Sequence, residues 1–203
     1  MRSILIRIMI YNQLMEINTE IFYFINHGMQ NNFFDLLMPT ITNIGTDIFL
    51  ISICIIILLY SIITKNISLK YLAITGIIAI IFADIAIGIL KVLINEPRPF
   101  ITLDNIHLLT NETDPYSFPS GHTGNIFALA TALGLRWTFN IKNKSIKLAW
   151  LLIPLAFIIG FSRIYIGVHY PFDVVAGAVI GIISGLIAIK IINNYLLNKK
   201  NEK

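Results

Sequence analysis

The sequence has few charged residues for its length, and this shortage argues against an ordinary soluble domain. Of its 203 residues, 13% are Asp, Glu, Lys or Arg, whereas soluble domains average roughly 25%. Hydrophobic residues make up 56% of the chain, and its mean hydropathy is +0.77. The length suits one domain. We therefore interpret the repeated apolar runs as membrane-spanning helices.

Cysteine is almost absent, since Cys54 is the only one and lies inside an apolar run. A single thiol excludes an intrachain disulfide and gives no information on whether the protein lies in an oxidising or a reducing compartment. Histidine, cysteine and carboxylate residues do not cluster at the ends of the apolar runs as metal ligands would. We therefore predict that the protein uses no metal and no other cofactor. The net charge of +4 is spread over the termini and short loops, which does not predict nucleic-acid binding.

The N-terminal region is more polar than the rest of the chain. Arg2 and Arg7 flank a short apolar patch, as in a signal peptide, but no small-residue cleavage pattern follows, so we predict that the segment is retained. Residues 16–38 mix apolar and polar side chains, which favours an amphipathic helix or helical hairpin at the membrane interface. Within a single domain of residues 1–203, we expect an interfacial region (1–47), a transmembrane catalytic core (48–195) and a basic tail (196–203).

Five strongly apolar segments predict an all-α fold, a polytopic membrane helical bundle. The expected spans are approximately 48–64, 71–94, 120–139, 148–166 and 171–195. Pro97 and Pro99 stop the second span, because proline cannot continue the helical hydrogen-bond ladder. In the fifth span, Gly177, Gly181 and Gly185 recur every four residues, a pattern that favours close helix packing.

The distribution of basic residues predicts the orientation in the membrane. The links 65–70 and 136–147 and the C-terminal tail are rich in Lys and Arg, so we place them in the cytoplasm. The loop 99–119 is acidic and the turn 167–170 has no lysine; we place both on the extracytoplasmic side. Five spans would leave the N-terminal arginines outside, so the N-terminal region supplies either an interfacial helix or a sixth crossing.

Pro119-Ser120-Gly121-His122 marks the start of the third apolar segment. Ser120 is a favourable N-cap residue, and Gly121 allows a ligand to approach the backbone amides. A helix N-terminus offers unpaired N–H groups and the positive end of the helix dipole, so it favours phosphate. Plain capping explains Ser120 and Gly121 equally well by themselves. With His122 facing the same volume, we favour a phosphate site.

Lys91 and Arg98 are seven residues apart, close to two helical turns, so we expect them on one helix face. A lysine near the end of a span also suits snorkelling to lipid head groups. Asp84 is a further seven residues from Lys91. This is roughly 10 Å along a helix axis, so direct pairing is not expected. An intramembrane carboxylate is a candidate functional group, and we assign Asp84 to internal packing or to tuning of Lys91.

His169 and Asp173 are four residues apart at the start of the fifth segment, which Pro171 helps to initiate. The carboxylate can accept a bond from one imidazole nitrogen, which fixes the tautomer and leaves the other nitrogen as a nucleophile. Arg163, six residues before His169, can direct its planar guanidinium at phosphate oxygens. Each histidine alone has a simpler explanation as a surface loop residue. The complete set predicts a pocket for a phosphate dianion that is faced by two imidazoles.

The order and spacing of these residues resemble the three-part signature of the type 2 phosphatidic acid phosphatase superfamily. The matching segments are Lys91-x6-Arg98-Pro99, Pro119-Ser120-Gly121-His122, and Ser162-Arg163-x5-His169-x3-Asp173. Ser-Gly-His alone is a weak signal, but the three segments in this order are specific. The resemblance implies a membrane helical bundle and metal-independent hydrolysis of a phosphate monoester or pyrophosphate on a lipid.

The resemblance also implies a role for each motif residue. His169 would be the nucleophile that forms a phosphohistidine, Asp173 would orient it, and His122 would protonate the leaving oxygen and then activate water. The residues that would hold the phosphoryl oxygens are Lys91, Arg98, Ser120, Gly121 and Arg163. The expected partners are a membrane lipid substrate and the lipid bilayer.

Two alternatives and the choice of substrate stay open at this point. A transporter or lipid-binding protein with a vestigial pocket would show gaps among His122, His169 and Asp173, and all three are present. A phosphotransferase with another acceptor than water would use the same residues. Among substrates we favour undecaprenyl or another polyprenyl diphosphate, by analogy with small members of the superfamily. Phosphatidic acid and phosphatidylglycerol phosphate also fit, and the sequence leaves the oligomeric state open.

Overall fold

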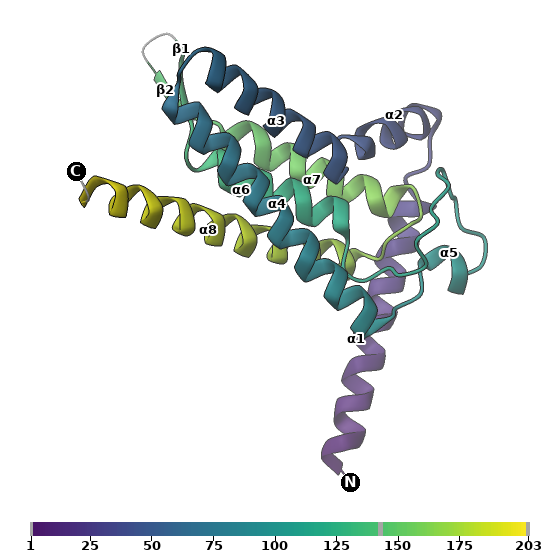
Figure 1. Cartoon of the computed structure of the whole chain (residues 1–203). Coiled ribbons are helices and arrows are strands. Elements are labelled where there is room, and N and C mark those ends of the chain that lie inside the picture. The colour runs from purple at the N-terminus through teal and green to yellow at the C-terminus, as the bar shows by residue number, and fades with distance from the viewer. Residues whose placement is uncertain (1, 142–143, 202–203) are drawn as a thin grey trace.

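The computed structural model describes residues 2–141 and 144–201 and shows a helical bundle with one small hairpin (Figure 1). In chain order the elements are α1 (Arg2–Asn26), α2 (Asn32–Asn43), α3 (Asp47–Ile63), α4 (Ile67–Ile94), α5 (Pro99–Thr102), α6 (Gly121–Gly134), β1 (Thr138–Ile141), β2 (Lys144–Lys147), α7 (Ala149–Tyr165) and α8 (Pro171–Asn201).

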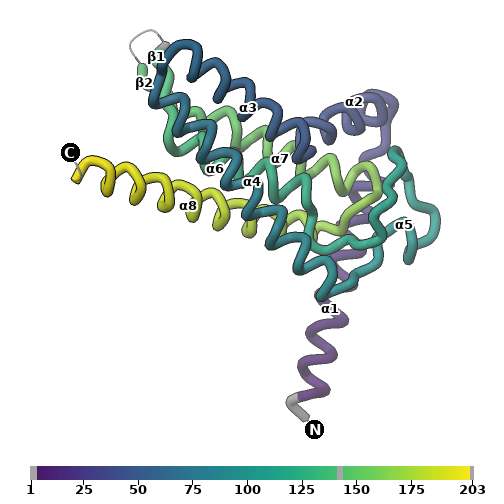
Figure 2. Tube along the Cα trace, in the orientation of Figure 1, coloured from purple at the N-terminus to yellow at the C-terminus, as the bar shows by residue number. Residues whose placement is uncertain are grey.

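Helix α6 forms the centre of the bundle, between α4, α7 and α8 (Figures 1 and 2). Every residue from Thr123 to Gly134 is buried. Helix α8 can approach it closely because a Cβ on Gly181 would lie 2.2 Å from the carbonyl oxygen of Gly124. A Cβ on Gly177 would lie 2.5 Å from that of Ser120. This confirms the close packing predicted from the glycine spacing, and it fixes the start of α8 against the start of α6.

The third predicted span does not continue as a helix to residue 139. Helix α6 ends at Gly134, and β1 pairs antiparallel with β2, with Phe139 opposite Ile146. Aromatic and β-branched residues favour strands over helices, and β1 contains Thr138 and Phe139 among them. The expectation of a purely α-helical chain was therefore wrong at the 136–147 link, where the described residues form a hairpin.

The structure supports membrane insertion but does not confirm five full-length spans. Helices α4 and α8 are each long and apolar enough to cross a bilayer, and α2 with α3 forms a third candidate with a bend of 55°. Helix α6 has 14 residues and α7 has 17. They are about 21 and 26 Å long by the standard helical rise, shorter than the roughly 30 Å hydrocarbon core. Both lie beside longer neighbours.

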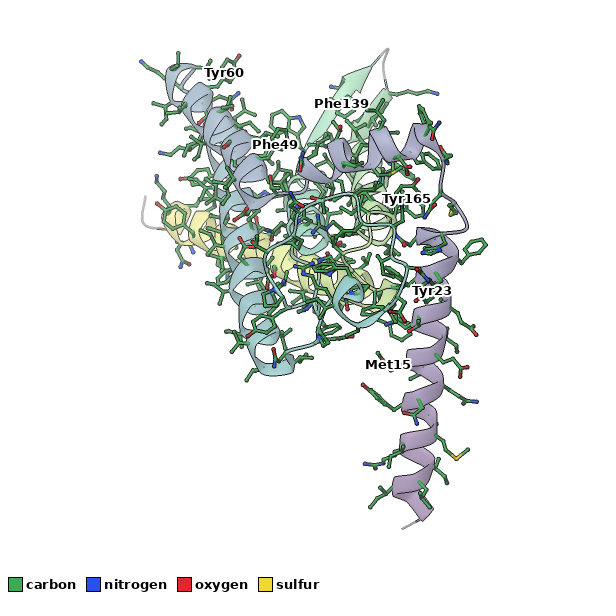
Figure 3. The ribbon with its side chains drawn as sticks, turned by 90° about the vertical axis from the view of Figure 1, so that its right-hand side faces the viewer. Met15, Tyr23, Phe49, Tyr60, Phe139 and Tyr165 are labelled. Atoms are coloured by element: carbon green, nitrogen blue, oxygen red, sulfur yellow. The ribbon has the colours of Figure 1, made fainter. Side chains whose placement is uncertain are left out.

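Helix α1 projects away from the bundle over its first half (Figure 1). Ile4, Leu5, Ile8 and Met9 are 50–66% exposed there, whereas Tyr23 lies where the helix meets the bundle (Figure 3). Within the described residues, α1 is not among the candidate spans. The predicted helical hairpin over 16–38 corresponds to the end of α1, a short turn and the start of α2.

The connection 103–120 wraps over the end of the bundle and is anchored near its start. Asn26 donates from Nδ2 to the carbonyl oxygens of His107 and Tyr165, at 2.9 and 2.8 Å. Asp35 accepts a bond of 2.6 Å from the Tyr165 hydroxyl and lies 2.9 Å from Nε2 of His107. These contacts hold the connection against α1, α2 and α7, and its remaining residues reach the ends of α4 and α8.

Candidate active site

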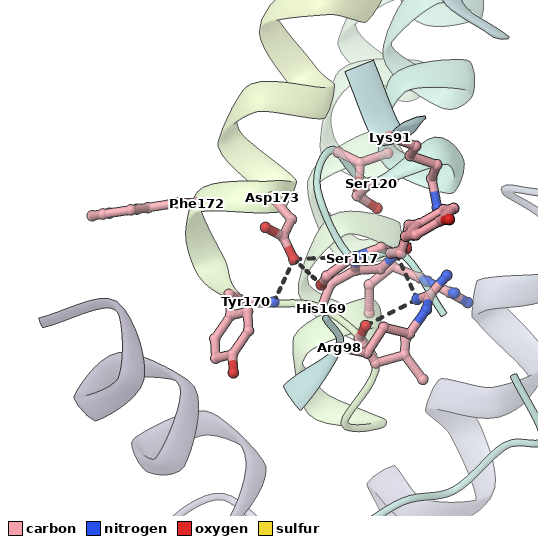
Figure 4. Close-up of polar contacts among 12 residues, drawn as sticks. Lys91, Arg98, Ser117, Ser120, His169, Tyr170, Phe172 and Asp173 are labelled. Carbon is pink, nitrogen blue, oxygen red and sulfur yellow. Dashed lines mark hydrogen bonds and ion pairs between the residues drawn. The ribbon is translucent and has the colours of Figure 1, made fainter. Parts of the chain in front are cut away.

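The predicted site residues lie around one cavity at the end of the bundle where α4 and α7 end and α6 and α8 begin. Figure 4 shows Lys91, Arg98, Ser120, His169 and Asp173 close together there. The cavity has a volume of about 280 Å³. Six of the predicted residues line it: Lys91, Arg98, Gly121, His122, Arg163 and His169. Ser120 and Asp173 lie in the same region and are fully buried. The structure therefore brings together all eight residues that the sequence singled out.

His169 is held through its Nδ1 atom. Oδ2 of Asp173 lies 3.3 Å from Nδ1, and the Ser117 hydroxyl lies 3.5 Å from it. Ser117 donates a 2.5 Å hydrogen bond to the same carboxylate oxygen, and the backbone N–H of Tyr170 donates another of 2.8 Å. Figure 4 shows these contacts converging on Asp173. One oxygen thus receives several donors and is fixed beside the imidazole.

The tautomer of His169 follows from its other neighbour. Nη1 of Arg98 lies 3.2 Å from Nε2. Because a guanidinium has only donors, Nε2 accepts, and the ring hydrogen is on Nδ1. Burial, reinforced by the nearby Arg163 and Arg98 charges, lowers the pKa of His169 well below its ordinary value. The ring is therefore neutral at pH 7, and its contact with Asp173 is a hydrogen bond of a neutral imidazole rather than an ion pair.

Three basic side chains line the cavity together with His169. Arg98 and Arg163 are 2% and 3% exposed, and Lys91 is partly buried. Arg98 is fixed by a 2.9 Å bond from Nη1 to the carbonyl of Val168, and Arg163 by a 3.0 Å bond from Nη1 to Thr42 on α2. Buried guanidinium groups held in this way are suited to hold an anion.

Arg98 does not lie on the helix face that the sequence predicted for it. Helix α4 ends at Ile94, and Asn95 adopts a left-handed conformation with a φ of 52°. Pro97 pairs with Tyr116 as an isolated bridge, and Arg98 precedes the short helix α5. Only Lys91 lies on the helix. The expectation that both residues share a helix face was wrong because the two prolines end the helix before Arg98.

The N-terminus of α6 forms another wall of the cavity. Ser120 occupies the N-cap position, but its side chain makes no capping bond and instead accepts a 3.0 Å bond from the Thr123 hydroxyl. Open space surrounds the position where a Cβ of Gly121 would lie, so the backbone there is accessible from the cavity. His122 follows one residue later and lines the same cavity. The helix start thus offers an anion-binding surface beside an imidazole.

Two acidic residues, which the sequence did not mark as site residues, complete the ring of charges. Glu112 Oε2 lies 2.9 Å from Arg163 Nη2 and 3.5 Å from Arg98 Nη2. Asp114 Oδ2 lies 3.3 Å from Arg98 Nη2 and also contacts the Lys91 ammonium. Burial opposes ionisation of Asp114, but the bonds from Lys91 and the Tyr116 N–H, together with the Lys91 and Arg98 charges, outweigh it and lower the pKa of Asp114. The only sequence signal was the acidic character of the loop 99–119.

Asp84 lies deeper along the same cavity. The spacing predicted that Asp84 would not pair with Lys91, and it does not. Instead, its Oδ1 accepts a 2.7 Å bond from Nδ2 of Asn125 on α6. Oδ1 of Asn125 is buried and has no hydrogen-bond partner among the described residues. The packing role proposed for Asp84 therefore has a specific form, a polar link between α4 and α6.

Comparison with known proteins settles the family. The PAP2 superfamily sequence model matches residues 69–196. The undecaprenyl-diphosphatase BcrC of Bacillus subtilis is 34% identical over 173 residues, which cover 84% of this chain and 81% of that protein. The chain belongs to the PAP2 superfamily. The predicted resemblance is confirmed, and the matched region contains every predicted site residue.

Two further comparisons agree with this assignment. The crystal structure of Aquifex aeolicus LpxE superposes with a TM-score of 0.69 at 33% identity, covering 86% of this chain and 95% of that one. The bacitracin transport permease protein BcrC of Bacillus licheniformis is 39% identical over 123 residues, 61% of this chain but only 55% of that protein. Other relatives carry the names lipid A 4′-phosphatase and phosphatidylglycerophosphatase B. The protein is a membrane lipid phosphatase of the PAP2 superfamily.

Proposed function

We propose that the protein hydrolyses the terminal phosphate of a lipid diphosphate, with undecaprenyl or another polyprenyl diphosphate as the first candidate. The geometry of His169 carries this proposal. Its Nε2 atom lies 3.2 Å from Arg98, its Nδ1 atom is held by Asp173, and Lys91 and Arg163 line the same cavity. The similarity to an undecaprenyl-diphosphatase over most of both chains supports the choice of substrate. Phosphatidic acid and phosphatidylglycerol phosphate are the competing substrates.

The first chemical step transfers the phosphoryl group to His169. Nε2 attacks the phosphorus, the new P–N bond forms, and the bond to the leaving oxygen breaks. The negative charge of the bound phosphate offsets the three basic groups and favours the protonated form of His122, which gives its proton to that oxygen. The phosphorylated imidazole is cationic, and the Nδ1–H bond to Asp173 stabilises it. Neutral His169 with its hydrogen on Nδ1 is the form that this step requires.

The second step returns the enzyme to its starting state. His122, now neutral, takes a proton from a water molecule whose oxygen attacks the phosphorus. The P–N bond breaks, its electron pair returns to Nε2 of His169, and inorganic phosphate leaves. Lys91, Arg98, Arg163 and the amides at the start of α6 hold the three equatorial oxygens in both steps. This sequence of steps uses no metal ion.

The proposed topology has five crossings, with the active site at the extracytoplasmic surface. Basic residues support this orientation, since the hairpin of β1 and β2 and the end of α8 carry lysines. The opposite end of the bundle holds the cavity and the acidic connection 103–120 (Figure 1). Helix α1 lies across that end, where its apolar first half suits the membrane interface. The whole chain then works as one domain.

A phosphate-release assay on purified protein tests the proposal directly. Undecaprenyl diphosphate, phosphatidic acid and phosphatidylglycerol phosphate are supplied at equal mole fraction in detergent micelles. We expect release from all three to depend on His169, with the highest kcat/KM for the diphosphate. A higher kcat/KM for either glycerolipid would reassign the substrate. Transfer of phosphate to an added alcohol in preference to water would make the enzyme a phosphotransferase.

A further inference from the structure

We propose that Glu112 and Asp114 exchange with phosphate on the same three basic side chains and so drive the release of the phosphate product. This inference rests on the proposed function, because it assigns a role within that catalytic cycle. The motif residues explain how phosphate binds. They do not explain how a dianion leaves a buried site that contains two arginines and a lysine.

The two carboxylates occupy positions that suit phosphoryl oxygens. Oε2 of Glu112 lies between the guanidinium groups of Arg163 and Arg98, at 2.9 and 3.5 Å. Oδ2 of Asp114 lies between Arg98, at 3.3 Å, and the ammonium of Lys91. Each basic group is therefore already paired. Because carboxylate and phosphate oxygens make similar charge-assisted bonds to guanidinium, they compete for the same donors.

While Glu112 and Asp114 are bound to the basic side chains, Arg98 also blocks the nucleophilic nitrogen of His169. Nη1 of Arg98 donates to Nε2 of His169 at 3.2 Å, while Nη2 of the same residue contacts both carboxylates. The lone pair of Nε2 is thus occupied while the carboxylates hold Arg98. A phosphate group that draws Arg98 onto its own oxygens frees Nε2 for attack. Substrate binding and exposure of the nucleophile are therefore one event.

The charge balance favours exchange in both directions. Lys91, Arg98 and Arg163 carry three positive charges, and the two carboxylates supply two negative charges. A bound phosphate dianion supplies the same charge from a single group. When the product forms, the carboxylates can return without leaving any buried cation unpaired, which would otherwise be costly. Without them, departure of the product would leave three basic groups with neutral hydrogen-bond acceptors but no partner of opposite charge at these contacts.

The backbone of the connection that carries these carboxylates is held at both ends, and the carbonyl oxygens of Asp114 and Tyr116 accept bonds from Arg98 and Lys91. Asn26 binds its start through His107, and Ser117 binds Asp173 at its end. Between them Asn111, Thr113 and Pro115 are exposed. The side chains of Glu112 and Asp114 are 21% and 40% exposed, so both carboxylates can turn toward solvent while the backbone stays in place.

The test measures the affinity for inorganic phosphate and for vanadate in purified wild type, Glu112→Gln and Asp114→Asn. The amide oxygen of each substituted side chain still accepts a hydrogen bond, so the fold is preserved while the competing charge is removed. Loss of one competitor should lower the Ki of both anions on the order of tenfold. KM should fall as well, and kcat should fall because phosphate leaves more slowly.

Asp104→Asn is the matched control. Asp104 is an exposed carboxylate of the same connection and makes no ion pair with any residue that the structure describes. Its Ki values should equal those of wild type. If this variant tightened phosphate binding as much as the other two, a general effect of loop charge would replace the proposed exchange.

Direct binding separates this inference from the proposed function. The thermal unfolding midpoint of each variant is recorded with rising inorganic phosphate, which requires no turnover. Glu112→Gln should unfold at a lower temperature than wild type without phosphate and gain more stability when phosphate is added. If wild type binds phosphate and releases it from lipids but neither variant binds it more tightly, only the exchange is refuted. If wild type does neither, the proposed function itself fails.

Discussion

Ser117 donates a 2.5 Å hydrogen bond to Asp173, although the two residues are 56 positions apart in the sequence. The accepting oxygen is the one that lies 3.3 Å from Nδ1 of His169. Ser117 belongs to the connection before α6, and Asp173 to the first turn of α8. The bond therefore joins the orienting carboxylate to the segment that also carries Glu112 and Asp114. We infer that Ser117 positions Asp173 for its bond to the nucleophile.

Replacing Ser117 by alanine should lower kcat and leave KM nearly unchanged. A hydrogen bond to a charged group contributes about 1.5–3 kcal/mol, which corresponds to a fall of roughly ten- to hundredfold in rate. Thr113→Ala, an exposed substitution in the same connection, is the control and should match wild type. If Ser117→Ala kept full kcat while its unfolding midpoint dropped, the hydroxyl would have only a structural role.

The sequence predicted the motif residues because each lies near the end of an apolar segment. Successive membrane helices alternate in direction, so these ends are expected on the same side of the bundle. The sequence did not predict Ser117, Glu112 or Asp114. These residues lie in an irregular connection whose path depends on contacts such as Asn26 with His107, far apart in the chain. Without that path, acidic loop residues resemble an ordinary solvated surface. The local sequence pattern therefore identifies residues at helix ends better than it identifies the loop residues that pack over those ends.

Boundaries of the helices were less predictable for a related reason. The apolar run after Ser120 continues past Gly134, and hydropathy alone does not distinguish a long helix from a short helix followed by a hairpin. Packing of α6 against α8 through Gly177 and Gly181 requires only the helical part. Arg98 illustrates the same limit, because helical spacing suggested its position but the turn at Asn95 determines it.

Gly181→Ala should destabilise the protein without touching the active site. A Cβ at this position would lie 2.2 Å from the backbone oxygen of Gly124, so α8 must move away from α6. Overpacking of this kind costs about 1–3 kcal/mol. Thermal unfolding in detergent measures the effect. Gly88→Ala is the control, because nothing lies within 4 Å of its added Cβ, and equal losses in both variants would refute the packing explanation.

Single cysteines at Asn111 and Ser145, in a Cys54→Ser background, test the proposed topology. Both positions are exposed and lie at opposite ends of the bundle. In intact cells, a membrane-impermeant maleimide should label Asn111→Cys but not Ser145→Cys, and permeabilised cells should label both. The reverse pattern would place the active site in the cytoplasm and contradict the proposed orientation.

Turnover should need no divalent metal. Within the described residues, no group of three His, Cys, Asp or Glu side chains is arranged to hold a metal ion, and the proposed steps place positive charge from Lys91, Arg98 and Arg163 on the phosphate instead. Phosphate release should persist in excess chelator, and vanadate should inhibit it. Activity that is lost in chelator and restored by magnesium would contradict the proposed mechanism.

The roles of the two histidines are tested with a substrate that has a good leaving group. A nitrophenyl phosphate needs little help from a general acid, so His122→Ala should still transfer phosphate to the protein. Without His122 to activate water, the phosphoenzyme should then accumulate. His169→Ala should form no phosphoenzyme and release no phosphate from lipid or nitrophenyl substrates.

Mapping the phosphorylated residue by mass spectrometry is the most direct test of the central claim. Purified His122→Ala is incubated briefly with nitrophenyl phosphate, quenched in base to preserve phosphohistidine, and digested. We predict phosphate on the peptide that contains His169, and none in the same experiment on His169→Ala. Phosphate on His122 in the His169→Ala protein, with none on His169 in the other variant, would contradict the account and reverse the two roles.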